Sequence, residues 1–425
     1  MVARTWKFFC SKKFVRVFIK PIQLFSIFIS QYHTNLSMKF LLKFLKWVAI
    51  SCTALIVLLY LFDVDYLLRA VKTIYLKGHT TAFLEDYKEF PNREIKKGVA
   101  QPWSISKDYN TIPATATLEK THQELKTVAF VVIKKDSIWH ESYFDGFNKN
   151  SKTNSFSMAK SVVTMALGKA IMEGKIKSLD QKVIDFFPEL KGKYAPSVTV
   201  GDLASMASGL SWDEKYYSPF SIVTRAYFDD DLNSLILGLN IHEKPGQSFK
   251  YLSGATQLLA MCIEKATGEY LSHYVSKHFW QPMGGENEAL WQLDHAPDGT
   301  EKAYCCIASN ARDFARFGKL YLQNGQWNGQ QLLDPAFVKK CITPRFKESV
   351  QYGYGWWIHS ISGKKLYYMR GHLGQFVIVI PEDQLIIVRL GHLKGLQTKE
   401  DPHSNDLYTY VAETYKMLAS KNKIR

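Results

Sequence analysis

A serine and a lysine three positions apart stand at the start of an apolar helical pattern. Ser157 follows a polar run, and Lys160 comes one helical turn later on the same face. The apolar residues after them recur every three or four positions and predict one buried stripe, ending near Gly174: Val162, Val163, Ala166, Leu167, Ala170 and Ile171. A helix N-terminus favours developing negative charge, and a partly desolvated lysine can accept a hydroxyl proton near neutral pH. The pair therefore predicts a nucleophile, Ser157, with Lys160 as its base.

The spacing alone does not decide between a nucleophile and a helix cap. A serine before a helix is most often an N-cap whose side chain accepts a backbone hydrogen bond. The same serine–lysine spacing also begins at Ser104, Ser362 and Ser420. Other segments of the chain must therefore support the catalytic interpretation.

Two later segments supply candidate partners. Tyr251 follows the turn Lys244-Pro245-Gly246, so its phenol can point into a cleft. Nearby cations would lower the pKa of the phenol there, and Tyr251 could then exchange protons with Lys160. Without that turn, a core tyrosine would be the better interpretation.

Further on, His372-Leu373-Gly374 is the only H-x-G in the chain and leads into a strand. The alternatives there are a β-bulge at Gly374 and a hydrogen-bonded polar side chain at His372.

Taken in order, these segments resemble the serine β-lactamase and penicillin-recognising superfamily, in its class C, esterase and amide-hydrolase branch. The resemblance covers roughly residues 120–395 and includes the serine–lysine motif, the loop 199–210, the segment 244–253 and the segment 370–375. It implies Ser157, Lys160 and Tyr251 as catalytic residues. It also implies an oxyanion hole formed by the backbone N–H groups of Ser157 and Gln375, with Ser253, His372 and Gly374 binding substrate. We expect no metal and no cofactor, because no cofactor motif appears in the sequence.

Two departures from the family pattern bear on the substrate. The second element has Ser253 where the β-lactamases usually have Asn, and the third begins with His372 where they usually have Lys. A histidine of ordinary pKa carries full charge only at acidic pH, so a clamp for a substrate carboxylate is weakened. The Tyr-x-Ser pattern is similar to that of 6-aminohexanoate-dimer hydrolases and some esterases. We therefore expect a membrane-anchored serine hydrolase that cleaves a small ester or amide through a Ser157 acyl-enzyme.

Three alternatives remain open at this point. One is a β-lactamase or a D-alanyl-D-alanine carboxypeptidase (penicillin-binding protein) acting on cell-wall peptides. A second is a catalytically silent, membrane-tethered protein that only binds peptide, although such a protein needs no intact set of Ser157, Lys160 and Tyr251. The third is a metallohydrolase, but the candidate ligands lack a helix-spaced pair: His359, His372, His392 and His403.

The elements around these residues predict an α+β fold. Buried-strand patterns occupy 128–133 and 137–142, and further strands are expected at 352–361, 365–369, 375–380 and 385–390. The region 157–345 is mostly helical in pattern, and a helix at about 404–420 closes the chain. Strands at both ends around a helical middle predict one mainly antiparallel sheet flanked by helices, with a helical lobe beside it. We assign the hydrolase domain to 111–420.

The N-terminal region predicts a membrane anchor. Residues 1–37 form a basic tail, possibly upstream of a true start at Met38. Within 38–62, Lys39, Lys43 and Lys46 precede an uncharged run that can cross a bilayer as a single span. The lysines place the tail in the cytoplasm, so we expect a bacterial inner-membrane protein whose catalytic domain faces the periplasm or exterior. A cleaved signal peptide is the alternative. Residues 63–110 form a membrane-proximal connector, helical around 66–76.

Composition is compatible with this interpretation. The 425 residues are 46% hydrophobic, enough for one large core or two lobes that share a cleft. The net charge of +15 is concentrated near the N-terminus, and no nucleic-acid-binding motif follows, so nucleic acid is not an expected partner. The expected partners are a small ester or amide and a membrane. The six cysteines show no metal spacing, and we expect buried free thiols.

Overall fold

The computed structural model describes residues 36–421, so nearly all of the basic tail predicted for 1–37 lies outside the described residues. The chain divides into two compact units, with the division between Lys77 and Gly78. The boundary that we predicted at residue 111 stays a prediction. The strands β1 and β2 precede it, and both belong to sheets of the second unit.

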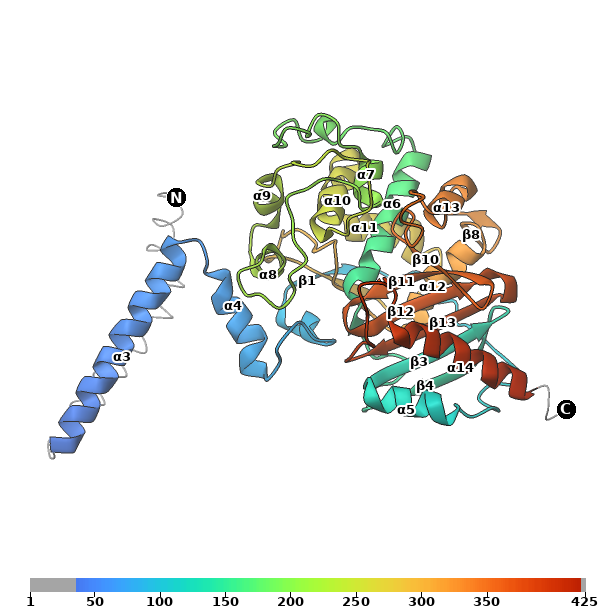
Figure 1. The fold of residues 1–425 in the computed structure, drawn as a ribbon, viewed down its shortest axis with the longest axis horizontal. Coiled ribbons are helices and arrows are strands. Elements are labelled where there is room, and N and C mark those ends of the chain that lie inside the picture. Colours follow the sequence, from blue (N-terminus) through green and yellow to red (C-terminus); the bar gives the residue numbers. More distant parts are fainter. Residues whose placement is uncertain (1–35, 422–425) are drawn as a thin grey trace. The chain divides into compact units, whose positions relative to one another are not determined.

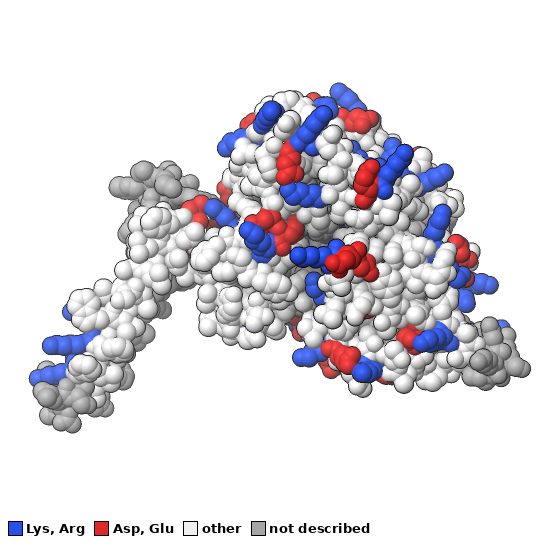
Figure 2. Space-filling view, in the orientation of Figure 1, with Lys and Arg blue, Asp and Glu red and all other residues white. Residues whose placement is uncertain are grey.

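The first unit is dominated by one long apolar helix. Helix α3 (Leu36–Leu61) contains a 24-residue stretch, Met38–Leu61, that is long and apolar enough to cross a membrane. None of that stretch is buried against protein, and in Figure 2 its surface is white apart from basic side chains toward one end. The expected connector helix is also present, as α4 (Tyr66–Thr73).

The second unit is built around a seven-stranded sheet with the order β10-β11-β12-β13-β3-β4-β2. All neighbours are antiparallel except β2 and β4, which are parallel. The strands are β2 (Ser104–Ile105), β3 (Thr127–Lys134), β4 (Ser137–Tyr143), β10 (Trp357–Ile361), β11 (Lys364–Gly371), β12 (Gln375–Ile380) and β13 (Leu385–Gly391). The first and last thirds of the hydrolase region therefore meet in one sheet, as expected.

One predicted strand begins later than expected. The pattern predicted a strand from residue 352, but β10 starts at Trp357. Gly353 and Gly355 explain the difference: a Cβ at Gly353 would lie 2.0 Å from the carbonyl oxygen of Cys341, and Gly355 has a φ of +76°. The chain therefore turns tightly across its neighbours before it can join the sheet.

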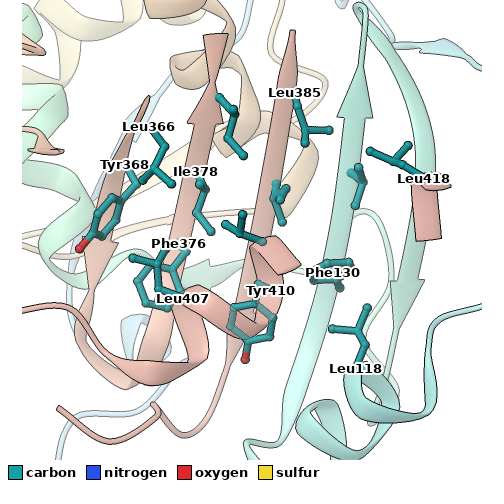
Figure 3. Close-up of a cluster of buried hydrophobic side chains, with 14 of the residues drawn as sticks. Leu118, Phe130, Leu366, Tyr368, Phe376, Ile378, Leu385, Leu407, Tyr410 and Leu418 are labelled. Atoms are coloured by element: carbon teal, nitrogen blue, oxygen red, sulfur yellow. The ribbon is translucent and has the colours of Figure 1, made fainter. Parts of the chain in front are cut away.

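Helices cover both faces of the sheet. Alternate residues of β12 point to opposite sides. Phe376 and Ile378 belong to a core with Leu407 and Tyr410 of α14 (Asn405–Lys421) and with Leu118 of α5 (Ala116–Glu124), as Figure 3 shows. Toward the other face, α12 (Ala311–Leu322) approaches so closely that a Cβ on Gly318 would lie 3.0 Å from Val379.

The remaining elements form the helical lobe, gathered above the sheet in Figure 1. Its helices are α6 (Ala159–Met172), α7 (Val200–Ala204), α8 (Ile222–Phe228), α9 (Leu232–Leu237), α10 (Ser253–Thr267), α11 (Leu271–Val275) and α13 (Pro335–Cys341). A four-stranded sheet of order β1-β6-β7-β5 and a short hairpin complete it: β1 (Asn92–Ile95), β5 (Thr153–Asn154), β6 (Ala289–Gln292), β7 (Ile307–Ser309), β8 (Gln326–Trp327) and β9 (Gln330–Gln331). The predicted α+β class is confirmed, with one mainly antiparallel sheet, helices on both of its faces and a helical lobe beside it.

Candidate active site

The predicted serine and lysine are in direct contact. Ser157 lies in a short 3₁₀ turn, Phe156–Met158, immediately before α6. The Nζ atom of Lys160 lies 2.9 Å from Ser157 Oγ and also donates to the carbonyl oxygen of Tyr304 at 2.7 Å. No side chain caps either the turn or α6. The N-cap alternative for Ser157 is therefore not supported, and its hydroxyl is left to interact with the lysine.

Lys160 is poised to change protonation state near neutral pH. Its side chain is only 2% exposed, and this burial lowers its pKa to about 8. Glu214 opposes the shift by stabilising the charged form. A substantial fraction of Lys160 is then neutral at slightly alkaline pH, which is compatible with the predicted role as a base.

A strained turn fixes the direction of Ser157. Phe156 has a φ of +46°, a conformation that costs a bulky residue about 1–3 kcal/mol. Its N–H donates to Oδ1 of Asn154 at 2.8 Å, and Nδ2 of Asn154 donates to Oδ1 of Asp86 at 2.9 Å. Asp86 is fully buried and also accepts a hydrogen bond from Tyr227 at 2.6 Å. A buried polar chain thus holds the turn in place.

Tyr251 lies beside Ser157 and Lys160, but its pKa is raised where we expected it to be lowered. Its ring stacks on Trp357 with centroids 5.7 Å apart, and Lys160 Nζ lies 5.1 Å from its centre. Burial raises the pKa of the phenol, as does Glu214, and together they outweigh the opposing effects of a hydrogen bond with Ser157 and of Arg370. The expected lowering was wrong, because the burial of the phenol and the nearby carboxylate of Glu214 could not be predicted from the sequence. Tyr251 is a neutral hydrogen-bonding acid.

The carboxylate in question, Glu214, was missed by the sequence analysis. Its Oε1 accepts from the indole of Trp212 at 2.9 Å and from the backbone N–H of Ser253. Its Oε2 accepts from the hydroxyl of Ser253 at 3.0 Å and from the phenol of Tyr216. Four donors therefore satisfy one carboxylate at the start of α10. The alternation Trp212-x-Glu214-x-Tyr216 is the available signal, since alternate residues of an extended segment share a face.

The segment predicted as the third catalytic element packs directly against the serine turn. A Cβ on Gly371, at the end of β11, would lie 2.2 Å from the carbonyl oxygen of Ser155. Leu373 and Gly374 then adopt φ values of +61° and +80°, which turn the chain into β12. Gln375 begins that strand, with its side chain buried and its Nε2 bonded to the carbonyl oxygens of His372 and Gly391.

Arg389 of β13 holds this turn from behind. Its fully buried guanidinium donates through Nη1 to the carbonyl oxygens of Leu373 at 3.0 Å and Gly374 at 2.9 Å. Because a trans peptide is planar, the N–H of Gln375 points away from Arg389 when the Gly374 carbonyl points toward it. A Cβ on Gly374 would lie 2.5 Å from Nη1, so only glycine fits beside the guanidinium.

His372 is enclosed by aromatic rings. It stacks on Tyr216 at 5.5 Å and meets Phe156 edge-on at 5.6 Å, while Nε2 lies 3.5 Å from the hydroxyl of Thr81. Burial and the positive charge of Lys394 lower its pKa to about 4. His372 is therefore neutral even at pH 6, where an ordinary histidine would carry substantial charge.

A cavity of about 310 Å³ joins these elements. The side chains around it are Ser157, Glu214, Tyr216, Tyr251, Trp357, Arg370, Gly371, His372, Lys394 and Gln397. Of the predicted residues, Ser157, Tyr251 and His372 line the cavity, while Lys160 lies behind Ser157. Ser253 directs its hydroxyl to Glu214, and Gly374 faces Arg389. Their predicted roles in substrate binding stay predictions.

The cysteines were expected to be buried free thiols, and the histidines were considered as metal ligands. Cys262 and Cys341 are buried free thiols, as expected. Cys305 and Cys306 are instead joined as a disulfide, so the prediction of free thiols is wrong for this adjacent pair. Within residues 36–421, no three His, Cys, Asp or Glu side chains converge as metal ligands.

Comparisons with known proteins agree with this geometry. The family model described as Beta-lactamase matches residues 115–408. The 6-aminohexanoate-dimer hydrolase of Paenarthrobacter ureafaciens is 26% identical over 244 residues, which are 55% of this chain and 61% of that protein. A protein of Escherichia coli K12, provisionally named a D-alanyl-D-alanine carboxypeptidase, is 22% identical over 56% of this chain and 68% of its own length.

A solved structure shows the same fold. It comes from Bacillus anthracis and carries the provisional name 6-aminohexanoate-dimer hydrolase. It aligns with a TM-score of 0.64 at 22% identity, covering 80% of this chain and 93% of its own. The sequence match to the Paenarthrobacter hydrolase, in contrast, spans less than two thirds of that protein's length.

Proposed function

The chain is a serine hydrolase of the beta-lactamase family, and we propose that it cleaves a short ester or amide through an acyl-enzyme on Ser157. One observation carries the proposal: the 2.9 Å contact between Ser157 Oγ and Nζ of a lysine whose pKa is about 8. A cavity of about 310 Å³ is near the lower end of ligand-site volumes, which favours a small substrate.

The proton path follows from the two neighbours of Ser157. Neutral Lys160 accepts the hydroxyl proton as Ser157 Oγ attacks the substrate carbonyl carbon. When the tetrahedral intermediate collapses, the neutral phenol of Tyr251 donates its proton to the leaving alcohol or amine. Protonated Lys160 then restores the proton to Tyr251. Water hydrolyses the acyl-enzyme by the same path in reverse, and Ser157 regains its hydrogen.

The oxyanion of the intermediate is assigned to two backbone donors. These are the N–H of Ser157, in the strained turn, and the N–H of Gln375, at the start of β12. The orientation of the Gly374–Gln375 peptide by Arg389 supports this role, because it directs the second N–H away from the guanidinium. Each such donor is worth roughly 2.7–4 kcal/mol in the transition state.

The proposal includes a membrane anchor. Met38–Leu61 is the segment whose length and composition suit a bilayer, and Lys39, Lys43 and Lys46 mark its cytoplasmic end by the positive-inside rule. The catalytic unit is then carried on the opposite, periplasmic or exterior side.

Covalent labelling tests the nucleophile. The parent should react with a fluorophosphonate probe and hydrolyse short-chain p-nitrophenyl esters, and Ser157→Ala should lose both activities. Ser161→Ala is the matched control, because Ser161 is buried on the same helix with its hydroxyl bonded to the Gly355 carbonyl at 2.6 Å. Persistent labelling of Ser157→Ala, or loss of labelling only in Ser161→Ala, would assign the nucleophile elsewhere.

A further inference from the structure

The amine of Lys160 is held by a backbone group as well as by the nucleophile. Its Nζ atom lies 2.9 Å from Ser157 Oγ and donates to the carbonyl oxygen of Tyr304 at 2.7 Å. A lysine side chain is long and flexible, so its contacts decide where the nitrogen lies. The Tyr304 carbonyl belongs to the planar peptide that links Tyr304 to Cys305, so the backbone at Cys305 sets its direction.

That peptide leads directly into a disulfide between neighbouring residues, here called the adjacent-cysteine disulfide. It joins Cys305 to Cys306, and both residues are buried. A bond between neighbouring side chains closes a small ring that contains the peptide between them, so the backbone within the ring cannot rotate freely. Cys306 has a φ of +78°, a conformation that a residue other than glycine keeps only where its surroundings hold it.

The same short segment also binds the turn that carries the nucleophile. The carbonyl oxygen of Ile307 accepts a hydrogen bond from the N–H of Ser155 at 2.7 Å. The N–H of Ile307 in turn donates to Ser155 Oγ at 3.1 Å. Ser155 lies two residues before Ser157. Residues 304–307 therefore bind the base at one end and the serine turn at the other, and the adjacent-cysteine disulfide lies between the two.

Hydrogen bonds to β6 hold the two cysteine carbonyls. The indole of Trp291 donates to the carbonyl oxygen of Cys305 at 3.0 Å, and the N–H of Gln292 donates to that of Cys306 at 3.1 Å. These bonds fix the part of the segment that follows Tyr304, whereas the Tyr304 carbonyl itself accepts from Lys160. The ring of the disulfide is thus the covalent link between the anchored carbonyls and the one that holds the lysine.

We propose that the adjacent-cysteine disulfide positions Lys160 for catalysis, because it fixes the carbonyl of Tyr304 to which the lysine amine is bound. The proposal rests on the proposed function, because it concerns the base of the same Ser157 reaction. Cys305 and Cys306 are positioning residues, and they take no part in the proton path. Disulfides persist in oxidising compartments, which is compatible with the exterior side proposed for the catalytic unit.

A looser Tyr304 carbonyl should change both the rate and its pH dependence. The other groups that face Lys160 are the hydroxyl of Ser157, the carboxylate of Glu214, and the rings of Tyr251 at 5.1 Å and Tyr304 at 5.9 Å. A carbonyl binds a protonated amine more strongly than a neutral one. Loss of this acceptor therefore disfavours protonated Lys160, and the midpoint of kcat/KM against pH should move to lower pH.

Two double variants of the full chain, purified in detergent, test the positioning role. Cys305→Ser with Cys306→Ser removes the disulfide. Cys305→Ser with Cys306→Gly removes it too, and glycine adopts the left-handed conformation without strain, so this variant keeps the fold where serine is strained. The matched control is Cys341→Ala, which removes a buried free thiol at the end of α13.

The measured quantities are kcat and KM for p-nitrophenyl acetate across the pH midpoint, corrected for the rate of Ser157→Ala, and the melting temperature. Both double variants should lower kcat about tenfold, the effect of one hydrogen bond to a charged group, with a much smaller change in KM. Their pH midpoints should move to lower pH. Cys341→Ala should melt at a lower temperature but keep the parent kcat and pH midpoint.

Mass spectrometry checks that the disulfide exists. After alkylation of the denatured parent without a reductant, the peptide that contains Cys305 and Cys306 should be unalkylated and should lack two hydrogens. Two alkylated thiols in that peptide would overturn the proposal.

The kinetic outcomes separate this proposal from the proposed function. If Ser157-dependent hydrolysis is present but the Cys305→Ser, Cys306→Gly variant keeps the parent kcat and pH midpoint, the positioning role is refuted and the hydrolase assignment stands. A lower melting temperature with an unchanged midpoint, or an equal change in Cys341→Ala, would show a general effect of core packing and would also refute it. If the parent hydrolyses no ester and takes no fluorophosphonate label, the proposed function fails and the positioning role fails with it.

Discussion

Replacing Arg389 by lysine should separate the stability of the β12 turn from its role in catalysis. Arg389 donates to five acceptors: Thr127 Oγ1 and the carbonyl oxygens of Leu125, Leu373, Gly374 and Leu393. A lysine ammonium has three hydrogens, so at least two acceptors lose their donor. At about 1–2 kcal/mol for each, Arg389→Lys should cost roughly 2–4 kcal/mol of unfolding free energy.

The catalytic effect has a different origin. When the carbonyls of Leu373 and Gly374 are no longer both held, the Gly374–Gln375 peptide can rotate and its N–H leaves the oxyanion position. Loss of one such donor lowers kcat about 100-fold, equivalent to about 2.7 kcal/mol, with a much smaller effect on KM. Inhibition by phenylboronic acid should weaken in parallel, because its tetrahedral adduct on Ser157 needs the same two donors.

Arg316→Lys provides the matched control. Arg316 is equally buried, and it donates to the carbonyl oxygens of Met283 and Gln101 and to Asp313, none of which lines the active-site cavity. Both variants should lose stability, but only Arg389→Lys should lose kcat and boronate affinity at a temperature where both are folded. Equal losses of kcat in the two variants, or an unchanged kcat in Arg389→Lys, would refute the reasoning.

Two further predictions concern pH and topology. The kcat/KM for a neutral ester should rise with pH through a midpoint of about 8 and level off at higher pH, because only neutral Lys160 accepts the serine proton. Glu214→Gln should move that midpoint to lower pH, because the charge of Glu214 favours protonated Lys160. A midpoint that stays in place or moves upward would contradict the assigned role of Glu214. Protease added to spheroplasts of a Gram-negative host should digest the domain after residue 63, whereas protection until lysis would place that domain in the cytoplasm.

The contact between the proposed nucleophile and the proposed base could be predicted from the sequence because the two residues are close along the chain. Ser157 and Lys160 are one turn apart at the start of a helix, so the 3.6-residue period brings them together whatever the rest of the fold does. The strand β12 could also be predicted, because a continuous run of apolar residues is typical of a strand that is buried on both faces of the sheet. Local periodicity was sufficient for these elements.

The remaining parts of the site depend on contacts between distant segments. The pKa of Tyr251 rises because its phenol is buried and, to a smaller extent, because Glu214 lies nearby. Glu214 belongs to an irregular loop without periodicity, so its position could not be predicted. Lys394 follows β13 in a loop and reaches the cavity only because β11 and β13 flank β12. In the sequence it is one of many lysines. In the sequence, Arg389 only interrupts an apolar strand. Its burial is explained by the hydrogen bonds that it donates to the turn at Leu373 and Gly374.

The hydrogen-bonded chain from Asp86 through Asn154 to Phe156 determines which proteolytic fragments can remain active. A cut between Leu61 and Gly78 separates helix α3 from the catalytic unit and leaves Asp86 with that unit, so the fragment keeps its serine turn. A cut after Glu89 removes Asp86 and leaves the buried amide of Asn154 without that acceptor. Proteolysis therefore yields a catalytic fragment with an intact serine turn only when the cut lies before Asp86.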